Sequence, residues 1–132
     1  MHTRQTSNPL NTYRQVAAQT ATPGQLVLML YDGAIRFLEQ AKAGFTKDDP
    51  LEHNRTINNN IIKAQAIINE LNSCLDMNQG GECAITFRRL YDYMDRRLQE
   101  SNLSKKEDGI LETIRRLGVL RDAWAEMLQK SA

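Results

Sequence analysis

The sequence is poor in the residues that build metal centres and disulfide frameworks. It has only two cysteines and two histidines in 132 residues. Cys74 and Cys83 match no metal-binding or redox spacing, and neither His2 nor His53 has a glutamate three positions before it. A carboxylate-bridged metal site in a helical bundle needs that Glu-x-x-His pattern on two helices. We therefore expect a chain with reduced thiols and without a metal site.

Charge of one sign and long apolar runs are also missing. Seventeen basic residues face sixteen acidic ones, so the formal net charge is +1. This balance excludes a general attraction to nucleic acid or to an anionic membrane. No apolar run approaches the ~18 residues of a membrane span, and residues 1–10 lack the apolar core of a secretory signal. We expect a cytoplasmic protein that does not insert into a membrane.

Proline is scarce, and each of the three prolines follows a residue that favours the N-cap of a helix. The pairs are Asn8-Pro9, Thr22-Pro23 and Asp49-Pro50, and proline is favoured at the first position of a helix. Capping-box spacing, in which a polar residue precedes Glu or Gln by three, occurs at Thr22–Gln25, Asp49–Glu52 and Ser104–Glu107. The paired glycines within 77–82 predict a loop.

Between these signals the apolar residues recur every three or four positions, which predicts helices. No window alternates with the period of a strand. We predict long helices over 23–45, 50–76, 82–102 and 105–130, and the short loops favour antiparallel neighbours. The expected fold is all-α, an up-down-up-down four-helix bundle over 21–132. A mobile N-terminal segment, 1–20, precedes it and carries a short capping helix over 9–19.

The stretch LMLYDGAI poses a local conflict, because Asp-Gly between apolar runs is typical of a hairpin turn. The apolar stripe from Val27 to Phe45 continues in phase through it, so we place Asp32 and Gly33 in the middle of a helix. A mid-helix glycine costs up to ~1 kcal/mol relative to alanine. It leaves a notch that either a neighbouring helix or a bound partner can fill.

Leu30-Tyr31-Asp32 recurs sixty positions later as Leu90-Tyr91-Asp92, which suggests two related helical hairpins. Each aspartate precedes an arginine by four, so the pattern predicts the surface ion pairs Asp32–Arg36 and Asp92–Arg96. The alternative is a pair of catalytic carboxylates. No nucleophile, base and orienting residue stand out as a set, and we therefore expect a protein that is not an enzyme.

Three arginine pairs, at 88–89, 96–97 and 115–116, leave a second alternative open. Acidic residues are interleaved with them, which favours a solvated, ion-paired face. A helical nucleic-acid-binding or regulatory protein that uses these pairs is the alternative. Apolar residues that lie off the main stripes, among them Leu26, Ile35 and Ile62, instead favour an apolar groove that recognises a helix of another chain.

Four segments of the sequence together resemble one family. They read TATPGQLVLMLYDGAIRFL, NNNIIKAQAIINELNSCLD, GGECAITFRRLYDYM and LGVLRDAW, and the resemblance runs from about Asn11 to Trp124. They are similar to the flagellar secretion chaperone family FliS, whose members are flagellin-specific export chaperones. Cys83 departs from the family pattern, which usually has a larger aliphatic residue after GGE.

The resemblance implies a four-helix bundle that binds the disordered C-terminal region of flagellin on apolar surfaces without ATP or cofactor. The chaperone prevents premature polymerisation and delivers flagellin to the cytosolic domain of the flagellar export gate; an anti-sigma factor is another partner in the family. The N-terminal segment is displaced on loading, and we expect it to occupy part of the client groove in the free protein. Helix phase and this resemblance give the expected partner-binding residues, which are Leu10, Tyr13, Val16, Leu26, Leu30, Tyr31, Gly33, Ile35, Ile61, Ile62, Ala64, Ile68, Leu90, Tyr91 and Met94.

Overall fold

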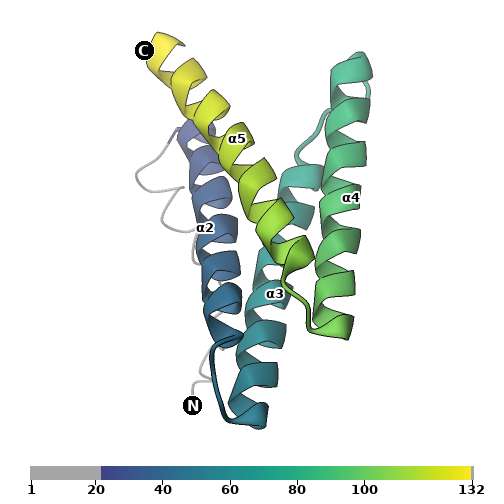
Figure 1. Cartoon of the computed structure of the whole chain (residues 1–132). Helices are drawn as coiled ribbons and strands as arrows, with labels where there is room; N and C mark the ends of the chain where they lie inside the picture. The colour runs from purple at the N-terminus through teal and green to yellow at the C-terminus, as the bar shows by residue number, and fades with distance from the viewer. Residues whose placement is uncertain (1–21, 132) are drawn as a thin grey trace, which may run out of the picture.

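The computed structural model describes residues 22–131 and contains four long helices, each antiparallel to its neighbours (Figure 1). They are α2 (Pro23–Gly44), α3 (Pro50–Ser73), α4 (Gly81–Ser104) and α5 (Asp108–Ser131). The expected all-α fold is confirmed, and every helix boundary lies within three residues of its prediction. The predicted short helix over 9–19 and the segment 1–20 lie outside the described residues.

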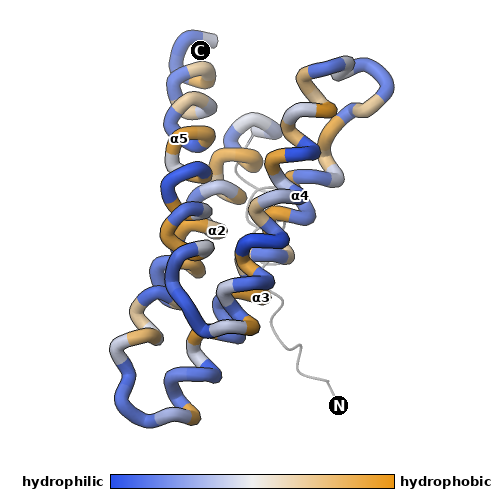
Figure 2. The backbone as a smooth tube through the Cα atoms, turned by 45° about the vertical axis from the view of Figure 1, so that its right-hand side comes forward, coloured by the Kyte–Doolittle hydropathy of each residue, from blue (hydrophilic) through white to orange (hydrophobic). Residues whose placement is uncertain are grey.

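The helices form a ring in which each one packs on two neighbours. Helix α2 contacts α3 and α5, and α4 contacts the same two helices from the other side. The α2–α3 contact is the most extensive and the α4–α5 contact is the least. This order is that of an up-down-up-down bundle. The start of α4 and the end of α5 lie well apart in both Figure 1 and Figure 2, so the bundle opens toward that end.

The core is a continuous seam of aliphatic side chains from all four helices. Each helix supplies residues three or four positions apart, which places them on one face. Figure 2 shows these apolar positions along the facing sides of the helices and largely hydrophilic connections. Each fully buried Leu or Ile contributes about 1.5–3 kcal/mol. The largest side chains with no exposure are Leu38, Ile57, Ile61, Ile67, Ile68, Met94, Leu98, Ile110 and Leu117.

Of the three predicted capping boxes, the one at Thr22 is confirmed. The backbone N–H of Gln25 donates to Thr22 Oγ1 (3.2 Å), and Gln25 Oε1 accepts from the Thr22 N–H (3.0 Å). Asp49 is the N-cap of α3, but its side chain makes no capping hydrogen bond. Proline at the next position supplies the helical φ angle without needing a cap for its own nitrogen, which lacks a hydrogen.

The predicted capping box at Ser104 is wrong, because α4 extends through that residue. The Ser104 hydroxyl donates back to the carbonyl of Glu100 (2.8 Å), a bond typical of serine inside a helix. The chain then turns at Lys105, whose φ of 53° is left-handed. Helix α5 starts only at Asp108.

The last turn of α4 and the first turn of α5 approach unusually closely. The backbone N–H of Gly109 donates to the buried Ser101 Oγ at 2.9 Å. A Cβ added at Gly109 would lie 2.5 Å from this oxygen and would overlap the carbonyl oxygen of Arg97. The absence of a side chain at Gly109 therefore sets the distance between the two helices at their closed end.

We predict that Gly109→Ala lowers the free energy of unfolding by roughly 1–3 kcal/mol, because the added methyl group must push the helices apart. Gly118 is the matched control on the same helix, since a Cβ there meets nothing within 4 Å. Gly118→Ala should raise stability by up to about 1 kcal/mol through helix propensity. Urea unfolding followed by circular dichroism measures both variants, and equal effects of the two would contradict this account.

Candidate binding surfaces

A hydrogen-bonded tyrosine pair joins the two diagonal helices α2 and α4. The hydroxyl oxygens of Tyr31 and Tyr91 lie 2.6 Å apart, and each residue is only 3% exposed. Burial raises the pKa of both tyrosines. Both side chains are therefore protonated at neutral pH, so one hydroxyl donates to the other. The pair lies at the boundary of the core that faces the open end of the bundle, where α4 starts and α5 ends.

An apolar cleft of about 170 Å³ begins at this tyrosine pair. All four helices contribute to its wall. Its position, between the starts of α2 and α4 and the ends of α3 and α5, is the end of the bundle that opens in Figure 1. Apart from the two hydroxyl groups and one thiol, the lining side chains are hydrocarbon or indole. The lining residues are Val27, Tyr31, Leu71, Cys74, Leu75, Phe87, Tyr91 and Trp124.

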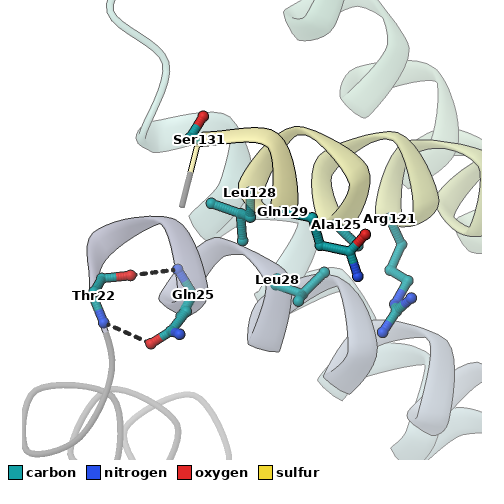
Figure 3. A pocket seen from close by; sticks show the side chains of 8 residues that line it. All are labelled: Thr22, Gln25, Leu28, Arg121, Ala125, Leu128, Gln129 and Ser131. Carbon is teal, nitrogen blue, oxygen red and sulfur yellow. Dashed lines mark hydrogen bonds between the residues drawn. The ribbon is translucent and has the colours of Figure 1, made fainter.

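A second and larger hollow of about 640 Å³ lies between α2 and α5; we call it the α2–α5 groove. Figure 3 shows Leu28 of α2 and Leu128 of α5 pointing into the space between the two helices. Polar side chains surround this apolar centre, which is the arrangement of a surface that binds an amphipathic segment. The lining residues are Thr22, Gln25, Leu28, Arg121, Ala125, Leu128, Gln129 and Ser131.

Two polar contacts fix α5 against α2 beside this groove. Trp124 Nε1 donates to the carbonyl of Gly24 at 2.8 Å. Arg121 Nε lies 2.7 Å from Asp32 Oδ1. The sequence predicts Arg36 of the same helix as the partner of Asp32, and the structure adds this contact with Arg121 of α5. Asp32 lies at the edge of the apolar stripe of α2, where a long side chain from the neighbouring helix can reach it.

The second aspartate of the repeat also contacts a neighbouring helix. Asp92 Oδ1 accepts a hydrogen bond from Asn72 Nδ2 of α3 at 2.9 Å. Further amide contacts continue along this seam, with Asn102 donating to Asn58 at 2.9 Å. The α3–α4 seam is therefore polar on its outer side, whereas the α2–α5 groove is apolar.

In each of the three arginine pairs, one side chain contacts another residue of the bundle and the other side chain is exposed to solvent. Arg88 of α4 donates to Asn72 of α3 (3.2 Å), and Arg97 of α4 donates to Glu112 of α5 (2.8 Å). Arg116 donates to Glu112 of its own helix (2.9 Å). The other members are exposed and form no hydrogen bond or ion pair with the residues that the structure describes. They are Arg89, Arg96 and Arg115.

Glu112 is the electrostatic centre of the α4–α5 seam. Its carboxylate accepts hydrogen bonds from Arg97, Arg116 and the Tyr93 hydroxyl, all within 2.9 Å. The hydrogen bond from Arg97 is the main cause that lowers the pKa of Glu112 from 4.5 to about 2, followed by that from Tyr93. The carboxylate is therefore charged at neutral pH, and it already accepts three hydrogen bonds.

Comparison with known proteins identifies the family. A family model described as "Flagellar protein FliS" matches residues 6–131, nearly the whole chain. The chain belongs to the FliS family. It is 39% identical over 122 residues to the flagellar secretion chaperone FliS of Bacillus subtilis strain 168, covering 92% of this chain and 87% of the relative.

Other FliS relatives match at similar length. The flagellar secretion chaperone FliS of Salmonella typhimurium strain LT2 is 33% identical over 131 residues, covering 96% of this chain and 95% of the relative. That of Campylobacter jejuni is 33% identical over 117 residues, with coverage of 89% and 88%. This FliS-family chain is therefore similar to its relatives over the full length of the bundle. Among the helices of residues 22–131, none is both long and apolar enough to cross a membrane.

The fold of this FliS-family chain places most of the expected partner-binding residues inside the bundle. Leu26, Ile35 and Leu90 are half-buried, and Ile62 is 52% exposed on α3. Leu10, Tyr13 and Val16 lie outside the described residues. The remaining eight are buried, and they are Leu30, Tyr31, Gly33, Ile61, Ala64, Ile68, Tyr91 and Met94. Of these, Tyr31 and Tyr91 also line the apolar cleft.

Several residues that line the two hollows were absent from the sequence-based set. Leu28 and Leu128 lie in the α2–α5 groove, and Phe87 and Trp124 line the apolar cleft. All four are partly exposed apolar residues near the open end of the bundle. Leu28 lies off the main stripe of α2, and this was the available signal. The other three belong to regular helical stripes, from which exposure cannot be deduced.

We predict that Tyr31→Phe and Tyr91→Phe each lower the free energy of unfolding by about 1–3 kcal/mol, because each leaves one buried hydroxyl without its partner. The double variant removes both hydroxyls and should lose no more than either single variant. Urea unfolding of the four proteins gives the coupling energy. Losses that simply add would contradict a direct bond between the two side chains.

We predict that protonation of Glu112 lowers the free energy of unfolding in acid. Its folded pKa lies below its unfolded value, so its contribution is complete above about pH 4.5 and is lost as the pH falls toward 2. Glu112→Gln should lower the free energy of unfolding at neutral pH by roughly 1–2 kcal/mol. It should also flatten the pH dependence of the melting temperature between pH 4.5 and pH 2.

The matched control is Glu126→Gln, which removes an exposed carboxylate from the same helix. It should keep the acid slope of the unaltered protein. Glu112→Gln and Glu126→Gln proteins with the same slope in calorimetric scans would show that the Glu112 cluster does not carry the effect.

Proposed function

We propose that this protein is a cytoplasmic chaperone of flagellar secretion that binds the disordered C-terminal region of flagellin. The bound segment would occupy the α2–α5 groove and the apolar cleft, which keeps flagellin from polymerising before export. The chaperone would then deliver it to the cytosolic domain of the flagellar export gate. Membership of the FliS family supports the flagellar role, and the names of the relatives as secretion chaperones support a secreted client.

The observation that carries the proposal is the α2–α5 groove, with apolar side chains at its centre and polar ones around it. A disordered client that becomes helical on binding meets an ordering cost of about 2–5 kcal/mol. Burial of apolar area at ~25 cal/mol per Å² offsets this cost. A preformed groove is favoured for this task because the chaperone itself then needs little ordering.

The buried members of the predicted site take a different role in this proposal. Residues such as Ile61, Ile68 and Met94 have no exposed surface. They hold the helices in place, and the client would contact partly exposed residues such as Leu28, Leu128 and Trp124. The resemblance to the family also brings an anti-sigma factor as a further partner, which we include in the proposal.

We predict that Leu28→Glu weakens binding of a flagellin C-terminal peptide at least tenfold, because it places an unpaired carboxylate in the apolar centre of the groove. Leu103→Glu is the matched control, since Leu103 is 78% exposed and lines neither hollow. Isothermal titration calorimetry measures both variants, and circular dichroism confirms that both are folded.

Two further readouts distinguish apolar groove binding from a charged contact. The binding heat capacity should be negative, and the affinity should change little between low and moderate salt. A peptide whose apolar positions are replaced by serine should not bind. Equal affinity of the unaltered, Leu28→Glu and Leu103→Glu proteins for the flagellin peptide would contradict the proposed site.

A further inference from the structure

A third hollow, of about 340 Å³, lies on the other side of α5, between α5 and α4; we call it the α4–α5 groove. It is lined by Leu90, Arg115, Arg116, Val119 and Leu120. The α5 residues of this groove lie about 120–260° around the helix from Arg121, at about 100° per residue. The α4–α5 groove and the α2–α5 groove therefore face in different directions, and the client proposed above does not account for it.

The floor of the α4–α5 groove is apolar and open to solvent. Val119 is 66% exposed, while Leu90 and Leu120 are half-buried. Leu111, which is 40% exposed, continues the same stripe of α5 two turns before Val119. An exposed apolar row of this kind on a helix pair is typical of a surface that receives another helix.

The charged residues that line the floor, Arg115 and Arg116, are both basic. Arg115 lies on the stripe between Leu111 and Val119, and it has no ion pair among residues 22–131. Arg89 and Arg96 are seven residues apart on α4, so both lie on the side of α4 that carries Tyr93. Tyr93 reaches α5, where it donates to Glu112 and lies under the guanidinium of Arg116.

The carboxylates of this seam are already engaged. Glu112 accepts three hydrogen bonds, and Glu100 is paired with Arg97 at 2.9 Å. They cannot neutralise the three exposed arginines, and none of the residues that line the groove is acidic. The α4–α5 face therefore has an apolar floor with a local excess of positive charge, although the net charge of the whole chain is only +1.

We propose that the α4–α5 groove docks an amphipathic helix of a second protein, distinct from the secreted client. Its apolar row covers Leu90, Val119 and Leu120, and its acidic flanks pair with Arg89, Arg96 and Arg115. Charge complementarity selects an acidic helix over a basic one. The aliphatic floor favours a protein helix over a nucleic acid, because a strand of phosphates offers no apolar surface to cover it.

The test uses two synthetic helical peptides of about 18 residues, or five turns. Both carry the same row of leucines, and their flanks are either glutamate or lysine. Fluorescence anisotropy with the full-length protein should show that the glutamate peptide binds at least tenfold more tightly than the lysine peptide. Arg89→Glu with Arg115→Glu should reverse this preference, and Val119→Asp should weaken both peptides.

The matched control is Lys42→Glu with Arg55→Glu, which changes the net charge by the same amount on α2 and α3. Both residues are exposed, and this control should keep the preference for the glutamate peptide. The same loss of preference in both double variants would overturn the proposal, because it would show a general effect of charge.

Two other results would also overturn the proposal. If the Leu28→Glu protein no longer bound the glutamate peptide, the binding site of that peptide would be the α2–α5 groove. Tighter binding of a single-stranded RNA oligonucleotide, lost in the Arg89→Glu, Arg115→Glu protein, would assign the face to nucleic acid. Because neither result depends on flagellin, failure here leaves the proposed client site untouched.

Discussion

The buried hydrogen bond between Tyr31 and Tyr91 is the contact on which the arrangement of the bundle depends. Helices α2 and α4 lie on a diagonal of the ring and pack on the same two neighbours, not on each other. The two phenol rings cross this diagonal, and their hydroxyls satisfy one another at 2.6 Å. On one side of the pair, fully buried side chains such as Leu38, Ile57 and Leu98 form the core. On the other side, the helices separate and the apolar cleft begins.

The same contact gives physical meaning to the internal repeat. Tyr31 and Tyr91 occupy matching positions of the sequence repeat, and matching residues are expected to meet if a two-fold axis relates the two hairpins. Asp32 contacts α5 and Asp92 contacts α3, which are equivalent neighbours under that exchange. The symmetry is incomplete, because α2 and α3 pack far more extensively than α4 and α5. The looser hairpin is the one that carries the third, positively charged groove.

Local signals predicted the helices well, and they predicted contacts between helices poorly. The helix limits and the capping box at Thr22 depend on residues close in sequence, so periodicity and residue type were sufficient. The pairing of Asp32 with Arg121 depends on how α5 is rotated about its own axis, which no local pattern fixes. For the same reason, the apolar stripes led us to expect a partner-binding role for Ile61 and Met94, which are buried within the bundle. A stripe reports burial, and burial against the bundle looks the same in the sequence as burial against a partner.

For the arginine pairs, helix geometry does limit which contacts are possible. Adjacent residues on a helix point about 100° apart, so a pair at the edge of a seam must place one guanidinium toward the neighbouring helix and one toward solvent. The inward members, Arg97 and Arg116, share one carboxylate at Glu112. The Arg97 bond joins α4 to α5, and Arg116 contacts α4 through the ring of Tyr93. That carboxylate already accepts from both inward members, and the outward ones form no ion pair among residues 22–131. A chain with almost no net charge thus obtains a locally basic face as a geometric consequence of closing the bundle.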